Sequence, residues 1–117
     1  MNMCDHAIIL LKQKIAEIEP QQAHAMQQQG GVIVDVRSLE EYQKNHIKEA
    51  IYLGRDYLEF KIEQHIPKKE TTIITHCASG FRSLFAAQSL LQLGYENVYS
   101  MIGGFKHWHQ LELPTEI

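Results

Sequence analysis

The sequence predicts an α/β fold in which helices cover both faces of a central parallel sheet, a doubly wound arrangement. Two observations point to this class. Residues 32–36 (VIVDV) and residues 71–75 (TTIIT) are short runs rich in β-branched side chains, which is typical of strands buried on both faces. Segments with helical spacing alternate with such runs along the whole chain, and this order favours a parallel sheet within one domain.

The helices of the first half are predicted from the signals at their ends. Asp5 can cap a short amphipathic helix that ends in lysines, and Pro20 suits the first turn of a second helix. Ser38 is followed three positions later by Glu41, the capping-box pattern that begins a third helix. The elements expected here are, in order, a helix over 5–14, a strand over 15–18, a helix over 20–29, a strand over 32–36, a helix over 38–44, a strand over 50–53 and a helix over 58–65.

The second half of the chain repeats the alternation of strand and helix. Leucine and alanine side chains after Ser83 lie along one stripe of a helix, and Gly94 would end it. The elements expected here are a strand over 71–75, a helix over 83–93, a strand over 98–99 and a helix from 103 to 111. We interpret residues 1–14 as a helical extension and residues 15–117 as the main domain.

Composition narrows the class of protein. At 117 residues the chain fits one domain, and 44% hydrophobic residues suffice for one core. A net charge of −3 gives no basic surface for nucleic acid. No apolar run approaches the ~18 residues of a membrane span, and the short N-terminal run lacks the features of a signal peptide. We therefore expect a cytoplasmic protein, a monomer or a weak dimer, with neither nucleic acid nor membrane as a partner.

Of the two cysteines, only Cys77 has the surroundings of a nucleophile. Two cysteines are too few for a disulfide framework, and neither has zinc-ligand spacing, so we expect no metal site. Cys77 directly follows the strand over 71–75, at the edge where ligands bind such sheets. Cys4 lies near the terminus without comparable neighbours, and we expect it to have no catalytic role.

The loop after Cys77 is predicted to be an anion cradle. Gly80 permits the positive φ of a nest of N–H groups, and the following helix start adds the positive end of its dipole. Arg82 adds a full charge, so the pKa of Cys77 should fall and a thiolate should form. The alternative is a small buried hydrophobe at a strand end. The candidate catalytic residues are Cys77 and Arg82, and the candidate substrate-binding residues of the loop are Ala78, Ser79, Gly80, Phe81 and Ser83.

Three motifs resemble the rhodanese-like sulfurtransferase family in its single-domain form. VIVDVRSLEEYQKNHIKEAIYL is similar to that family's Asp-Val-Arg signature, and THCASGFRS resembles its Cys-x-x-Gly-x-Arg-Ser loop. LGYENVYSMIGGFKHW resembles its Gly-Tyr to Gly-Gly to Trp ending. The resemblance covers residues 15–114 and implies the rhodanese-like fold.

The resemblance also implies an activity. A sulfane sulfur would pass from thiosulfate or a (poly)sulfide to cyanide or a thiol through a Cys77 persulfide, with ping-pong kinetics and no metal or organic cofactor. The partners would be small sulfur donors and acceptors, with an acceptor protein as a further candidate. The alternative is a catalytically idle binding or regulatory module. Arg55 lies in a segment that resembles one in single-domain members whose arginine reaches the active-site mouth, so we expect it either to bind an anionic donor or to pair with an acid at the surface.

A cysteine phosphatase is a further alternative, and the length of the loop argues against it. Tyrosine phosphatases place five residues between the cysteine and the arginine, whereas four separate Cys77 from Arg82. A shorter loop contracts the cradle, which then suits a bound sulfur better than the three outer oxygens of a phosphoryl group. The sequence therefore favours sulfur transfer.

Two residues depart from the family pattern. Asn45 stands where the family usually has a glycine before His46, and Glu49 stands where it has a glycine before Ala50. Asparagine tolerates the left-handed backbone region, whereas glutamate does not. We therefore expect the turn around Glu49 to differ from that of the family.

Five further residues are interpreted mainly as structural. The resemblance suggests that Asp35 and Arg37 brace the end of the sheet. His46 is interpreted as a hydrogen-bonded loop anchor rather than a base, and Trp108 as packing the last helix on the sheet. The side chain of His76 should point away from Cys77 if the strand alternation continues, and it would either pack or tune Cys77.

Overall fold

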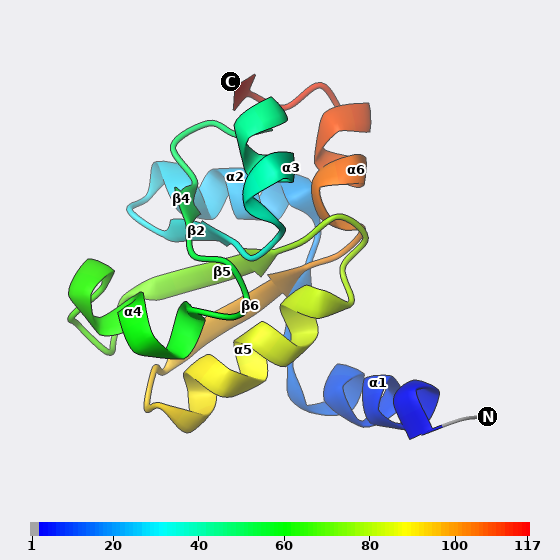
Figure 1. Ribbon diagram of the computed structural model, residues 1–117, viewed down its shortest axis with the longest axis vertical. Coiled ribbons are helices and arrows are strands. Elements are labelled where there is room, and N and C mark those ends of the chain that lie inside the picture. Colours follow the sequence, from blue (N-terminus) through cyan, green and yellow to red (C-terminus); the bar gives the residue numbers. More distant parts are fainter. Residues whose placement is uncertain (1–2) are drawn as a thin grey trace.

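The computed structural model describes the backbone of residues 3–117 and the side chains from Asp5 onward (Figure 1). The side chain of Cys4 lies outside this part, so its lack of a catalytic role stays a prediction. A five-stranded parallel sheet forms the centre, in the order β1, β6, β5, β2, β4. Its strands are β1 (Ala16–Ile18), β2 (Val32–Asp35), β4 (Ile51–Tyr52), β5 (Thr72–His76) and β6 (Asn97–Met101).

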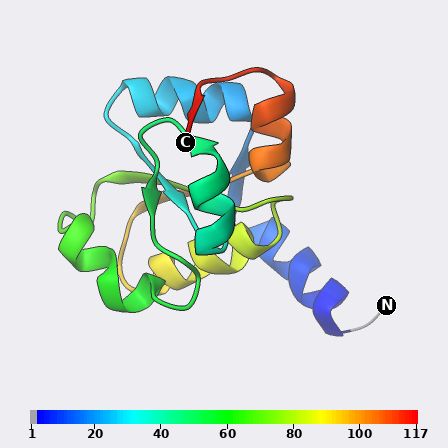
Figure 2. The same ribbon diagram turned by 45° about the horizontal axis from the view of Figure 1, so that its top comes forward.

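Helices cover both faces of this sheet, as the predicted fold class requires (Figures 1 and 2). One core contains side chains of α1, α4 and α5, and the other contains side chains of α2 and α6. Successive strand residues alternate between them, so that Ile73 lies in the first core and Ile74 in the second. The helices are α1 (Met3–Lys14), α2 (Pro20–Gln28), α3 (Leu39–Lys44), α4 (Leu58–His65), α5 (Arg82–Gln92) and α6 (Gly104–Gln110).

Each expected helix and strand is present, with ends that shift by at most a few residues. The capping box at Ser38 is confirmed, because its hydroxyl accepts the Glu41 N–H while the Glu41 side chain accepts the Ser38 N–H. The N-terminal helix α1 extends away from the sheet, yet its Leu11 is buried in the first core (Figure 1). Within residues 3–117, no helix combines the length and the apolar character needed to cross a bilayer.

The sequence analysis missed one small antiparallel pair, β3 (His46–Ile47) with β7 (Thr115–Glu116). It ties the C-terminus to the segment before β4. The His46 ring lies within hydrogen-bonding distance of two oxygens, with Nδ1 2.8 Å from the Tyr42 carbonyl oxygen and Nε2 3.3 Å from Glu116 Oε1. The interpretation of His46 as a loop anchor is therefore confirmed.

The two residues that depart from the family pattern lie just before β3, at Asn45, and in the turn between β3 and β4, at Glu49. Glu49 adopts φ 67°, the left-handed conformation that favours glycine, whereas Asn45 is extended at φ −171°. The turn is closed by the Ala50 N–H donating to the Ile47 carbonyl, and the Glu49 N–H donates to Glu116 Oε1 at 3.0 Å. A glutamate therefore occupies a backbone conformation that favours glycine, and a difference between this turn and that of the family stays a prediction.

Replacing Glu49 with glycine is expected to stabilise the protein. A left-handed non-glycine residue costs about 1 to 2 kcal/mol, and the greater freedom of glycine in the unfolded chain offsets part of the gain. We expect the free energy of unfolding to rise by about 0.5 to 1 kcal/mol in urea titrations. Glu49→Ala is the control, because it removes the carboxylate but keeps the strained backbone. Equal stabilities of the glycine and alanine variants would contradict this account of the turn.

Candidate active site

The side chain of Cys77 lies at the carboxyl end of β5, on the face covered by α4 and α5. It is fully buried. The Gly80 N–H donates to Cys77 Sγ at 3.1 Å, and Gly80 adopts φ 101°, so the predicted role of this glycine in turning an amide inward is confirmed. The thiol in turn donates to Ser83 Oγ at 3.7 Å. The sulfur therefore accepts one hydrogen bond from the backbone of its own loop and contacts the hydroxyl of Ser83.

The carbonyl groups of the cysteine loop point toward the first turn of α6. The Phe105 N–H donates to the Cys77 carbonyl at 2.7 Å, and the Lys106 N–H donates to the Ala78 carbonyl at 3.2 Å. These contacts satisfy N–H groups that a helix start leaves without partners. In a trans peptide the N–H points opposite to the C=O, so the amides of Ala78 and Ser79 face away from α6. Helix α6 thus sets the orientation of the loop amides.

Gly104 makes this close approach possible, and the sequence analysis missed that role. A Cβ at Gly104 would lie 2.2 Å from the Cys77 carbonyl oxygen and 2.7 Å from the Ala78 carbonyl carbon. Its φ is 57°, which also favours glycine. The Gly-Gly pair in the sequence was the available signal, but it was interpreted only as the start of a helix.

A buried hydroxyl network fixes the start of α5 beside the sulfur. The Ser83 and Ser100 hydroxyls share a hydrogen bond of 2.8 Å, and the Thr75 hydroxyl donates to the Ser83 carbonyl at 2.8 Å. All three side chains are buried. Ser100 was not predicted as a site residue because the last strand was expected to end at residue 99. A polar residue within a buried strand is the signal that would have identified it.

Asp35 and Arg37 form a buried ion pair beneath the loop, which confirms their bracing role. The Arg37 Nη2 donates to Asp35 Oδ2 at 2.8 Å and to the Asn45 carbonyl at 2.8 Å. The Arg37 guanidinium also lies 4.3 Å from the ring centroid of Phe105, a cation–π distance. This pair therefore links the end of β2 to the turn of α6 that holds the loop.

His76 lies beside this ion pair and on the opposite face of the sheet from Cys77, as the alternation predicted. Its Nδ1 is 3.4 Å from the Cys77 carbonyl oxygen, and its Nε2 is 3.5 Å from Asp35 Oδ2. The second contact lacks hydrogen-bond geometry. His76 Nε2 is therefore the one buried side-chain nitrogen or oxygen without a hydrogen-bond partner in the described part of the chain. Complete burial lowers the pKa of His76 to about 4, and the nearby Asp35 only partly offsets this. The imidazole is therefore neutral near neutral pH.

The depressed pKa of His76 predicts a loss of stability in acid. Unfolding exposes the ring to water, where its pKa returns to about 6.5, so the unfolded chain binds the extra proton first as pH falls. The contribution of the neutral His76 to the free energy of unfolding is complete above pH 6.5. It is lost as the pH falls toward 4, by at most about 3 kcal/mol. Urea titrations at several pH values should show a larger acid loss in wild type than in His76→Phe. Equal losses in the two proteins would contradict the assignment.

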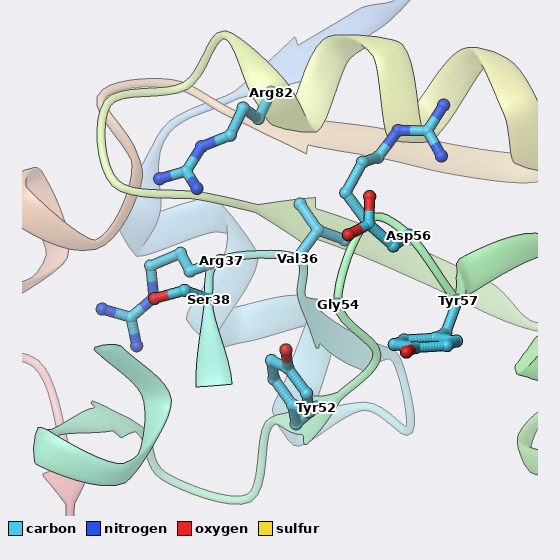
Figure 3. A pocket seen from close by; sticks show the side chains of 9 residues that line it. Val36, Arg37, Ser38, Tyr52, Gly54, Asp56, Tyr57 and Arg82 are labelled. Atoms are coloured by element: carbon cyan, nitrogen blue, oxygen red, sulfur yellow. The ribbon is translucent and has the colours of Figure 1, made fainter. Parts of the chain in front are cut away.

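A cavity of about 350 Å³ adjoins the cysteine loop (Figure 3). Figure 3 shows Arg82 and Arg37 on one side of it and Asp56 and Tyr57 on the other. A second cavity of about 460 Å³ shares Arg55, Asp56 and Arg82 with the first. The two cavities together form a groove, which we call the arginine groove.

The arginine groove brings together two residues that the sequence analysis selected. Arg55 donates to Glu59 at 2.8 Å and to Ser89 Oγ at 3.0 Å, and Arg82 Nη2 lies 3.5 Å from Glu41 Oε1. These ion pairs are partly exposed, and such pairs contribute little stability. Arg55 thus pairs with an acid, one of its two expected roles, and its binding of an anionic donor stays a prediction. The charge of Arg82 faces the groove, and its expected action on the thiolate stays a prediction.

The groove is joined to the cysteine loop by Val36. This residue lines the cavity, donates its N–H to the His76 carbonyl at 3.0 Å and belongs to the same core as Cys77. Cys77 itself lines neither cavity of the groove in the described structure, since its side chain is covered. The outer part of the loop is accessible: Ser79 is exposed, and Phe81 is 48% exposed. The site therefore consists of a covered sulfur, a solvent-exposed loop surface and the adjoining arginine groove.

One protein family matches most of the chain. Residues 19–111 match the Rhodanese-like domain. The chain belongs to this family. The resemblance noted in the sequence and the predicted fold class are thereby confirmed.

Curated relatives of this rhodanese-like domain are named as sulfurtransferases. Thiosulfate sulfurtransferase GlpE of Haemophilus influenzae (strain PittEE) is 41% identical over 101 residues, which cover 86% of this chain and 93% of that protein. A protein of the same name from Pseudomonas savastanoi pv. phaseolicola is 36% identical over 91 residues, covering 78% of this chain and 84% of the relative. The homology therefore supports a sulfurtransferase.

Solved structures share the fold and carry names for two chemistries. A Rhodopseudomonas palustris protein of unknown function, named a possible tyrosine phosphatase, has a TM-score of 0.86 at 26% identity and covers 99% of this chain and 96% of its own. A thiosulfate sulfurtransferase from Pseudomonas aeruginosa has a TM-score of 0.81 at 25% identity and covers 90% of this chain and 21% of its own. The fold alone does not decide between the two chemistries, so the decision rests on the site.

Proposed function

We propose that this rhodanese-like domain is a sulfurtransferase that moves a sulfane sulfur from thiosulfate or a (poly)sulfide to cyanide or a thiol through a Cys77 persulfide. The observation that carries this proposal is the Gly80 N–H aimed at Cys77 Sγ within a loop whose carbonyls point away to α6. Such a cradle favours negative charge on sulfur. The named sulfurtransferase relatives support the same reading.

The reaction divides into two displacements at sulfur. In the first, the Cys77 thiolate attacks the outer sulfur of thiosulfate; a Cys77–sulfur bond forms, the sulfur–sulfur bond of the donor breaks, and sulfite leaves with the electron pair. In the second, the acceptor attacks the outer sulfur of the persulfide, and the Cys77 thiolate leaves. The loop amides stabilise the terminal sulfur between the two steps, in the manner of an oxyanion hole. No other oxidant or reductant is needed.

Access to the sulfur requires the loop to open. Cys77 is fully buried, whereas Ser79, Phe81 and Arg82 form the exposed side of the loop. We infer that the donor enters from the arginine groove and displaces this exposed side. A small thiol or an acceptor protein would approach the persulfide by the same route.

The same observations argue against two alternative functions, a binding module and a phosphatase. A binding module would need neither the amide aimed at Cys77 Sγ nor the buried hydroxyl network at Ser83. A phosphatase would need room for three phosphoryl oxygens, whereas the four-residue loop already closes on the bare sulfur at 3.1 Å. Both observations favour sulfur transfer.

Initial-rate kinetics test the proposal. With thiosulfate and cyanide both varied, a covalent persulfide predicts parallel double-reciprocal lines, the pattern of a ping-pong reaction. Turnover of a phosphate ester such as p-nitrophenyl phosphate should not exceed background. Phosphate-ester turnover without sulfur transfer would establish the phosphatase alternative, and the absence of both activities would support the binding module.

Removing either arginine of the groove is expected to weaken donor binding. Arg55→Ala and Arg82→Ala each delete one partly exposed cation, so the KM for thiosulfate should rise about three- to tenfold while kcat changes less. Arg55→Lys keeps the charge and should lie between wild type and Arg55→Ala. An unchanged KM in both alanine variants would show that the donor does not use this groove.

A further inference from the structure

We propose that His76 is a positioning residue for Cys77: its neutral imidazole donates the Nδ1 proton to the Cys77 carbonyl and so fixes the first peptide of the loop whose Gly80 N–H donates to the sulfur. This inference rests on the proposed function, because it names a residue that prepares the same nucleophile. The ring touches no substrate and lies on the face of the sheet opposite Cys77 Sγ. Its effect would therefore pass through the backbone.

The position of the proton follows from the two oxygens that face the ring. Asp35 Oδ2 already accepts from Arg37 Nε at 3.1 Å and from Nη2 at 2.8 Å. The Cys77 carbonyl accepts the Phe105 N–H at 2.7 Å and has a second lone pair. A neutral imidazole has one N–H, and only the contact from Nδ1 to the Cys77 carbonyl has hydrogen-bond geometry. A proton on Nε2 would leave the Nδ1 lone pair facing the Cys77 carbonyl oxygen, and the Nε2–H would lack hydrogen-bond geometry toward Asp35. We therefore place the proton on Nδ1.

The surroundings keep the ring in this one state. His76 is fully buried, and the charged groups that face it are Asp35 and Arg37, with His46 farther away. Arg37 neutralises Asp35 through a bidentate ion pair. The Asp35 carboxylate therefore favours a protonated His76 only weakly. Burial also holds the pKa of His76 near 4, well below neutral pH. The ring is therefore a fixed neutral donor rather than a general base.

Two donors from different elements hold the Cys77 carbonyl. The Phe105 N–H comes from α6, and His76 Nδ1 comes from the end of β5. The Phe105 ring is in turn held by the Arg37 guanidinium at 4.3 Å. Because the peptide between Cys77 and Ala78 is trans and planar, fixing its carbonyl also fixes the Ala78 amide on the other side. Removal of the histidine donor would leave this carbonyl to the Phe105 N–H. We expect the start of the loop to loosen as a result, and with it the alignment of the Gly80 N–H with Cys77 Sγ.

Three substitutions at His76 separate hydrogen bonding from packing. Asparagine places an amide N–H close to the position of Nδ1, glutamine places one close to Nε2, and phenylalanine fills the site without a donor. We expect His76→Asn to keep the rate and pH profile of Cys77 alkylation by iodoacetamide. His76→Gln and His76→Phe should shift that profile to higher pH and slow persulfide formation from thiosulfate about tenfold, with the KM for thiosulfate unchanged. His65→Phe, at an exposed histidine of α4, is the matched control and should behave as wild type.

Two results would overturn the proposal. One is a folded His76→Phe protein with the wild-type alkylation profile, and the other is an Asn variant as impaired as the Gln variant. If the Phe variant does not fold, the comparison of Asn with Gln decides alone. The nitrogen chemical shifts of wild-type His76 provide a direct check, since a proton on Nε2 would also overturn it. Alkylation does not depend on sulfur transfer, so a failure of this inference is distinguishable from a failure of the proposed function.

Discussion

Gly104→Ala is expected to displace the cysteine loop and to abolish most of the sulfur-transfer activity. The added methyl would lie 2.2 Å from the Cys77 carbonyl oxygen and 2.7 Å from the Ala78 carbonyl group, and all of these atoms belong to the backbone. The left-handed φ of 57° adds conformational strain. We expect a loss of about 3 to 5 kcal/mol in the free energy of unfolding. The rate of persulfide formation should fall about a hundredfold or more, because the loop amides lose their alignment with the sulfur.

Gly94→Ala is the matched control for this prediction. Gly94 also has a positive φ, 98°, but a Cβ there would meet nothing within 4 Å. The Gly94→Ala variant should therefore lose only about 1 to 2 kcal/mol in the free energy of unfolding, the cost of a left-handed non-glycine residue, and should keep full activity. Urea titrations and thiosulfate–cyanide assays on the two variants provide the comparison. Equal effects on stability and activity would mean that the contact between α6 and the loop does not position the site.

Cys77→Ser is expected to remove sulfur transfer while the fold stays intact. A serine hydroxyl fits the same buried space, and the Gly80 N–H can donate to its oxygen. A hydroxyl does not ionise near neutral pH and cannot form a persulfide, so turnover should fall by at least about a thousandfold, to background. The thiosulfate–cyanide assay measures this, with circular dichroism to establish that the variant is folded.

Cys4→Ser is the control for the loss of a thiol as such. It should keep the wild-type turnover, because Cys4 lies outside the motif that resembles the rhodanese cysteine loop. Activity that is retained in Cys77→Ser but lost in Cys4→Ser would show that Cys4, and not Cys77, is the nucleophile. That result would contradict both the site and the mechanism.

The parts of the fold that were predicted correctly are those decided by local sequence. The β-branched runs gave the central strands, and the Ser38 capping box gave the start of α3. The helix over 58–65 was predicted with both of its ends. By contrast, β3 and β7 have two residues each and pair across most of the chain, so neither carries a periodic signal of its own.

The same distinction applies to the site. The cradle at Gly80 and the position of Cys77 after β5 depend on residues close in sequence, and both were predicted. The contact of Gly104 with the Cys77 carbonyl and the link between Ser83 and Ser100 join separate segments, and neither was predicted. Arg82 was placed correctly at the helix start, but the direction of its side chain depends on Glu41 in α3, which local sequence does not show.

Intact-mass spectrometry after incubation with thiosulfate tests the central claim most directly. The full chain is mixed with thiosulfate, freed of small molecules and measured before and after cyanide is added. We expect wild type to gain the mass of one sulfur atom, cyanide to remove it, and Cys77→Ser to gain none. A wild-type chain that takes up no sulfur from thiosulfate or polysulfide, or a Cys77→Ser chain that still takes it up, would contradict the account.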